Sequence, residues 1–134
     1  MTTATPPDRG SNVVSNGFRV EVRPEYLAEQ SRPAQRKWVF AYRIRILNQS
    51  HRRARLRARH WIIVDADGER HDVVGEGVVG LQPTLNPGQQ FEYSSYCPLE
   101  TPWGTMEGSY TFEGDDGETF EVTVGRFFLV SSDA

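Results

Sequence analysis

The stretch Arg52–Ala66, RRARLRARHWIIVDA, decides the fold class. Arginine occupies every second position from 53 to 59, as Arg53, Arg55, Arg57 and Arg59. Successive side chains of a β-strand point to opposite faces, so this period of two predicts a half-buried strand. The arginines are expected on the solvent face, and the core face is expected to carry Leu56, Ala58, His60, Ile62 and Val64.

Similar alternation appears on both sides of this stretch. It predicts further strands at Phe18–Val22, Trp38–Asn48, Arg70–Val74, Gln89–Tyr96, Thr105–Glu113 and Glu118–Val130. Asp-Gly pairs and an Asn-Pro-Gly run between them are typical of tight turns. No segment keeps an apolar helical period for three turns. About seven strands with frequent turn signals predict an all-β immunoglobulin- or fibronectin type III-like β-sandwich.

The relation between Trp38–Asn48 and Arg52–Ala66 has two solutions. In a hairpin, the loop must contain an odd number of residues, since a loop of two would turn arginines into the core. Alternatively, the two strands lie in different sheets.

Length and composition indicate a single domain. The chain has 134 residues and a net charge of −3, and all its Lys and Arg residues except Arg126 lie at or before Arg70. A single cysteine, Cys97, cannot form an internal disulfide, which suits a cytoplasmic protein. No apolar run is long enough for a membrane span, and no signal peptide is evident. Residues 1–16, rich in Thr, Pro, Ser and Asn, are expected to be a disordered tail, and 132–134 a short C-terminal tail.

Gly75, Gly77 and Gly80 have the G-x-G-x-x-G spacing of a dinucleotide-binding loop. That loop works only when a helix follows and directs its amide groups at the pyrophosphate. Here Pro83 and Pro87 follow, which prevents such a helix. A structural bend is therefore favoured. The alternative is a nucleotide or pyrophosphate site that uses these glycines with Arg57 and Arg59.

The segment from Asp65 resembles a calcium loop in part. Asp65, Asp67 and Glu69 have the right spacing for weak Mg²⁺ or Co²⁺ binding, but Arg70 stands where the loop requires glycine. A polar hairpin turn is favoured. No catalytic constellation stands out, Cys97 has no candidate base, and no cofactor is predicted.

The arginine-rich strand is the most prominent predicted surface. Outward glutamates on later strands, Glu107, Glu113 and Glu121, favour neutralisation by cross-strand pairing. The alternative is a patch for an anion or an acidic partner. Nucleic acid is disfavoured, since the net charge is negative and exposed aromatic residues do not interleave with the basic ones.

Two long stretches resemble the ApaG (DUF525) family. They are RHWIIVDADGERHDVVGEGVVGLQPTLNPGQQFEYSSYCPLETPWGTMEGSYTF, at residues 59–112, and GETFEVTVGRFFL, at 117–129. The likeness runs from about Ser15 to Val130, and 17–131 is expected to be the ApaG domain. It implies a fibronectin type III-like sandwich in a bacterial family associated with cobalt resistance and magnesium efflux. It brings no established catalytic or metal-binding residues.

Residues and resemblance together favour a non-enzymatic module that binds an unidentified protein partner. The partner surface is expected to involve Trp61, Trp103, Arg53 and Arg55. Exposed edge strands would also allow a homodimer by edge pairing.

Overall fold

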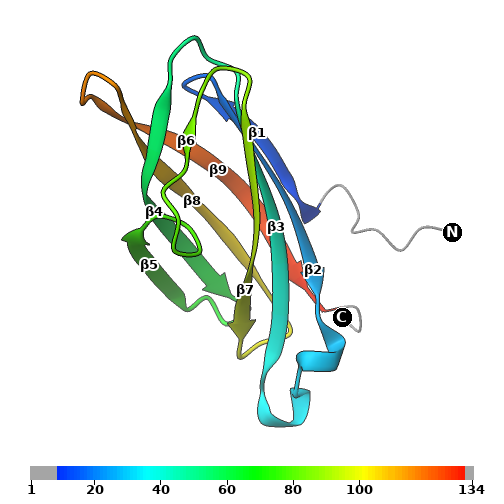
Figure 1. Cartoon of the computed structure of the whole chain (residues 1–134). Helices are drawn as coiled ribbons and strands as arrows, with labels where there is room; N and C mark the ends of the chain where they lie inside the picture. Colours follow the sequence, from blue (N-terminus) through cyan, green and yellow to red (C-terminus); the bar gives the residue numbers. More distant parts are fainter. Residues whose placement is uncertain (1–8, 132–134) are drawn as a thin grey trace, which may run out of the picture.

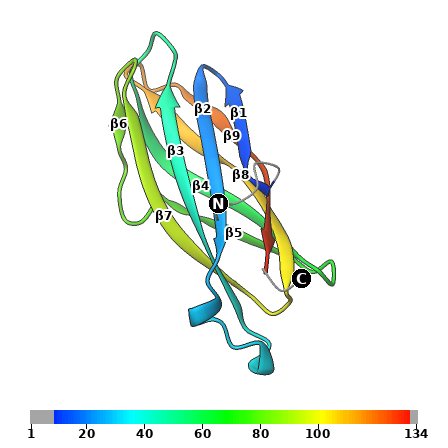
Figure 2. The same cartoon turned by 90° about the vertical axis from the view of Figure 1, so that its right-hand side faces the viewer.

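Two antiparallel sheets pack face to face in the computed structural model, which describes residues 9–131 (Figures 1 and 2). One sheet has the order β1–β2–β3–β7 and the other β5–β4–β8–β9, with β6 paired to the start of β4. The strands are β1 (Ser11–Ser15), β2 (Phe18–Tyr26), β3 (Trp38–Asn48), β4 (Ala54–Asp65), β5 (Arg70–Glu76), β6 (Thr84–Leu85), β7 (Gln90–Leu99), β8 (Trp103–Gly114) and β9 (Thr119–Val130).

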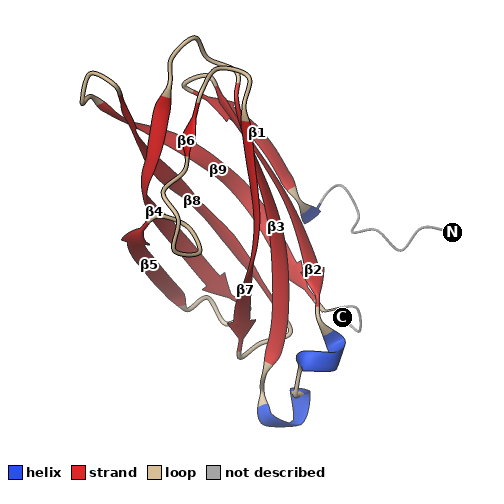
Figure 3. Cartoon of the chain, in the orientation of Figure 1, coloured by secondary structure: helices blue, strands red, loops and turns tan. Residues whose placement is uncertain are grey.

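Helical structure is confined to short turns (Figure 3). Two 3₁₀ helices, η2 (Ala28–Gln30) and η3 (Pro33–Gln35), connect β2 to β3. Within residues 9–131, no helix has the length and apolar character needed to cross a membrane.

The predicted all-β sandwich is confirmed. The two stretches whose relation the sequence left open, β3 and β4, lie in different sheets. Two strands were not predicted. One is the short β6, and the other is β1, so the expectation of a disordered tail over 1–16 is wrong for Ser11–Ser15. Residues 1–8 and 132–134, also expected to be tails, lie outside the described residues.

β1 forms because an Asn-Gly turn folds it back onto β2. Asn16 and Gly17 both have positive φ angles, 51° and 80°, as a two-residue hairpin turn requires. Ser15 pairs with Phe18, and Ser11 pairs with Val22. This short polar strand depends on its pairing rather than on apolar periodicity.

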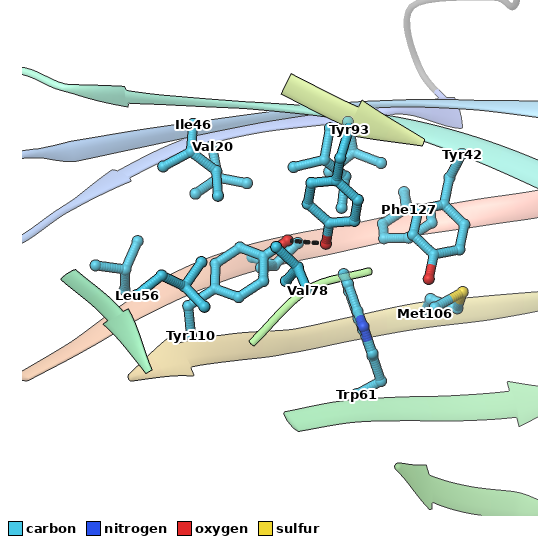
Figure 4. Packing of buried hydrophobic residues seen from close by; sticks show 14 of the residues in the cluster. Val20, Tyr42, Ile46, Leu56, Trp61, Val78, Tyr93, Met106, Tyr110 and Phe127 are labelled. Carbon is cyan, nitrogen blue, oxygen red and sulfur yellow. Dashed lines mark hydrogen bonds between the residues drawn. The ribbon is translucent and has the colours of Figure 1, made fainter. Parts of the chain in front are cut away.

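The core is aromatic and spans both sheets (Figure 4). Its fully buried side chains include Phe18, Phe40, Tyr110, Phe112 and Phe127. The hydroxyls of Tyr93 on β7 and Tyr110 on β8 lie 2.6 Å apart and form a buried hydrogen bond between the sheets. Burial raises the pKa of both tyrosines.

A β-bulge at Arg57 changes which residues of β4 face the core. The pairing register with β8 shifts between Leu56 and Ala58, which leaves Arg57 as the extra residue. The predicted core face is therefore correct as far as Leu56 and inverted beyond it. Trp61 is only 4% exposed, whereas the His60 side chain is 42% exposed and lies 2.8 Å from the Asp72 carboxylate.

The two long sides of the sandwich differ. On one side, which we call the closed side, β1 lies beside β9 (Figure 2), and three hydrogen bonds join β1 and the following turn to β9. Ser11 Oγ donates to the Gly125 carbonyl at 2.8 Å, and Asn16 Nδ2 donates to the Glu121 carbonyl at 2.6 Å. The Thr123 N–H donates to Ser15 Oγ at 2.7 Å. The opposite side, between β5 and β7, is the open side.

Candidate functional site

The open side contains a hollow of about 660 Å³ between the edges of the two sheets. Side chains from β3, β4, β5, β7 and β8 line it, among them Tyr42, Arg59, Trp61, His71, Ser95 and Met106. Trp61 lies beneath it in edge-on contact with Tyr42, Tyr110 and Phe127 (Figure 4). Concave sites of this size, with an apolar base and a few polar groups, are typical of ligand-binding pockets.

Arg59 reaches this hollow because of the bulge at Arg57. Its Nη1 donates to the backbone carbonyls of Glu76 and Gly77, at 3.0 and 2.9 Å. A Cβ at position 75 would lie 2.9 Å from Nη1, so Gly75 leaves the space that the guanidinium occupies. Burial raises the pKa of Tyr42, and the positive charge of Arg59 opposes part of that rise.

The glycine stretch forms a tight turn followed by a strand. Val78 and Leu81 exchange two backbone hydrogen bonds of 2.8 Å each, with Val79 and Gly80 between them at φ angles of 43° and 80°. β6 follows, in place of the helix that a dinucleotide-binding loop requires. None of Gly75, Gly77 and Gly80 lines the hollow. The geometry matches the structural bend that the sequence favoured.

The far end of the hollow is acidic. Asp65 is buried, and its Oδ1 accepts the N–H groups of Asp67 and Glu69, which closes the β4–β5 turn. Ligand atoms of Asp65, Glu69 and His71 lie within 4.8 Å of one another. Of the three metal-ligand candidates from the sequence, Asp65 and Glu69 belong to this group and Asp67 does not.

Nucleophilic chemistry finds little support at this site. Burial raises the pKa of the Cys97 thiol to about 11, which keeps it protonated at neutral pH. His60 is paired with Asp72, away from the hollow, and hydrogen bonds from Arg70 and then His60 hold the pKa of Asp72 well below its usual range. Among the hydrogen bonds within residues 9–131, none joins a serine, threonine or cysteine side chain to a histidine.

The three outward-facing arginines at the start of β4 and just before it have local partners, of which two are carboxylates. Arg57 lies 3.4 Å from Glu113 and Arg53 lies 3.7 Å from Asp115, while Arg55 donates to the Gln82 carbonyl at 2.9 Å. The other two predicted partners, Glu107 and Glu121, bond Arg126 and Thr111 instead. Because Arg59 faces inward, the four arginines do not form one basic surface.

Of the two tryptophans expected at a partner surface, Trp103 is 44% exposed, but Trp61 belongs to the core. The sequence reading missed Tyr42, Ser95 and His71 as lining residues. The apolar run of Trp61–Val64 does not indicate which of its residues face the core, since it fits either face. The separation of β5 from β7 depends on the order of the strands, which no local sequence pattern indicates.

Comparisons with known proteins agree on one family. The ApaG domain (DUF525) matches residues 28–114. The chain is 49% identical to the ApaG protein of Anaeromyxobacter dehalogenans strain 2CP-C over 120 residues, covering 90% of this chain and 94% of that one. It is 51% identical to the ApaG protein of Rhodospirillum centenum over 118 residues, covering 88% and 91%. The crystal structure of the ApaA protein from Bordetella pertussis superposes with a TM-score of 0.81 at 44% identity, covering 96% of this chain and all of that one.

Proposed function

The chain belongs to the ApaG family, and from this premise we propose that it is a non-enzymatic binding module whose open side receives a segment of a partner protein. The observation that carries the proposal is the hollow of about 660 Å³ between β5 and β7. Its apolar base and few charged groups suit recognition. Exposed apolar side chains beside it, Val73 at 39% and Tyr96 at 63%, add contact area at the rim.

Binding without catalysis is supported by the chemistry of the lining groups. The thiol at the hollow, Cys97, is protonated at neutral pH, and Tyr42 has a raised pKa that keeps its hydroxyl neutral. Arg59 is held by backbone carbonyls, as a recognition group would be. These groups can hold a ligand in place, but they offer no activated nucleophile.

We place this binding in the cytoplasm, in the divalent-cation homeostasis that the family resemblance implies. The module would then influence cobalt resistance or magnesium efflux through the protein it binds. A second copy of the chain is another occupant that the free edges of β5 and β7 would accept.

Photo-crosslinking in living cells tests the proposal. A photoreactive phenylalanine replaces Tyr96 at the open side or, as a matched control, Val14 on the closed side, which is 46% exposed. We expect a discrete protein adduct from position 96 that disappears when Val73→Phe partly fills the hollow.

Equal adducts from positions 14 and 96, or none from 96, would refute the proposal. An adduct of twice the mass of the chain would identify the occupant as a second copy.

A further inference from the structure

Four inward-facing residues of β4 form one wall of the hollow, with charge only at its two ends. They are Arg59, Trp61, Ile63 and Asp65, all lining residues. Asp65 lies six positions after Arg59, which is roughly 20 Å along a strand at about 3.3 Å per residue. This wall of the hollow is therefore long, apolar in the middle, and bounded by opposite charges.

The Arg59 end lacks a negative partner. Arg57, two residues earlier, has the Glu113 carboxylate within 3.4 Å. For Arg59, no carboxylate of residues 9–131 lies within 4.0 Å, and its bonds go from Nη1 to two neutral carbonyls. A guanidinium has five N–H donors in a planar fork that suits a carboxylate. This end is suited to an anionic group.

The opposite end has an excess of negative charge. Asp65, Glu69 and Glu100 line it, and a ring nitrogen of His71 lies within 4.8 Å of carboxylate oxygens of the first two. Glu69 and Glu100 are exposed. An ammonium or guanidinium group is the natural complement, because it would reduce repulsion among the three carboxylates.

The edge of β7 sets the direction of a chain in this hollow. β7 is the last strand of its sheet and pairs with β3 along one edge only. Its last residue, Leu99, lies beside the acidic end, since a Cβ at Gly104 would contact both Leu99 and Asp65. A segment that runs from the acidic end toward Arg59 is therefore antiparallel to β7, the commoner pairing in sheets.

We propose that the open side binds an extended peptide segment of about seven residues, antiparallel to β7, with a basic side chain near its start and a carboxylate near its end. The inference rests on the proposed function, because it assigns a ligand to the same site. The basic residue lies at Asp65, Glu69 and Glu100, the carboxylate at Arg59, and alternate side chains between them pack over Trp61 and Ile63. Main-chain bonds to an open sheet edge supply affinity, and the charged ends supply direction.

Selection from a random library of N-acetylated heptapeptides tests this inference. The library is screened as free acids and as C-terminal amides, so that the two termini do not confuse the charge pattern. We expect selected peptides to place Lys or Arg near the start and an acidic residue or the free carboxylate at the end. Amide-shift mapping by NMR should place them at Val73 and Ser95, and not at Val14.

Two variants measure the charged ends separately. For a selected peptide, we expect Arg59→Met to weaken binding at least tenfold. Removing the peptide carboxylate should then weaken binding to the Arg59→Met variant little further. Glu69→Gln, at an exposed position, should weaken binding severalfold only while the peptide carries its basic residue. Arg43→Met, on the outer face of β3 with a 66% exposed side chain, is the matched control and should leave the affinity unchanged.

The outcomes separate this inference from the proposed function. Two outcomes would overturn the charge assignment and leave the proposed function in place. In the first, selected peptides bind at the hollow but share no order of charges. In the second, no peptide is selected, although position 96 still gives an adduct. Peptides that bind on another face, together with no adduct from position 96, would overturn both.

Discussion

The closed side and the open side of the sandwich differ in how their edge strands are paired. On the closed side, polar side chains of β1 and of the following Asn16 form hydrogen bonds with the backbone of β9, which joins the two sheets along this side. On the open side, β5 and β7 stand apart, and every residue of β5 except Gly75 is exposed. Unpaired strand edges invite pairing with other chains. The difference indicates that one side maintains the fold while the other is available for a ligand.

The largest expected effect comes from enlarging a residue on the closed side. In Gly125→Val, the new side chain would meet Val13, whose Cγ2 lies 2.6 Å from the Cβ position. We expect the free energy of unfolding to fall by about 1 to 3 kcal/mol, since overpacking forces the strands apart. Urea denaturation measures it. Val73→Phe on the open side should change it by less than about 0.5 kcal/mol, and equal losses would contradict the distinction between the sides.

Alkaline pH should destabilise the fold through Tyr93 and Tyr110, whose hydroxyls form the buried hydrogen bond between the sheets. Burial raises the folded-state pKa of Tyr93 and Tyr110 above the unfolded value of about 10. Their contribution to stability is therefore complete below pH 10 and is lost as the pH rises through the folded-state values. At pH 10.5 we expect a loss of about 1 to 2 kcal/mol in total for the pair.

Urea midpoints at pH 8 and pH 10.5 test this prediction. The double variant Tyr93→Phe, Tyr110→Phe should reduce the pH-dependent loss by about 1 to 2 kcal/mol. Part of the dependence should remain, because burial also raises the pKa values of Tyr42 and Cys97. An unchanged dependence would show that other groups cause it.

The same pair should respond asymmetrically to substitution. Tyr110→Phe removes one hydroxyl and leaves that of Tyr93 buried without its 2.6 Å partner. We expect this to cost about 1 kcal/mol, whereas replacing both tyrosines should be close to neutral, because no buried polar group then remains unpaired. Thermal and urea denaturation of the two variants give the comparison, and a double variant less stable than the single one would refute it.

The smallest expected effect is a gain at the turn beside the open side. Val79 has a φ of 43°, which a β-branched residue rarely adopts, and Gly80 follows it. Asparagine suits this position of a two-residue turn, so Val79→Asn should raise the free energy of unfolding by about 0.5 kcal/mol. Val74→Asn, at a 72% exposed strand position, is the control and should give no gain.

Most of the fold could be predicted from the sequence, because strand alternation and turn residues are local signals. β1 lies outside the predicted strands although its Asn16–Gly17 turn is a strong hairpin signal, because its five residues show little apolar periodicity. The bulge at Arg57 was missed for a different reason. From Trp61 to Val64 both faces are apolar, so the alternation could not show that the register had changed.

The site was less predictable than the fold. Arg59, Asp65 and Glu69 were selected, but as parts of a phosphate loop and a calcium loop rather than of one hollow. The hollow exists because β5 and β7 remain apart, and that depends on long-range strand order. A single sequence does not report which sheet edges fail to meet.

The way Arg59 is anchored has a consequence for how the sequence can evolve. Its guanidinium is fixed by main-chain oxygens at positions 76 and 77, which every residue type provides. Position 76 should therefore drift freely under neutral substitution, whereas a side chain at position 75 would displace the Arg59 guanidinium from these oxygens. Selection would then preserve Gly75 for the sake of an arginine sixteen positions upstream, whereas Gly77 and Gly80 are required by their positive φ angles of 64° and 80°.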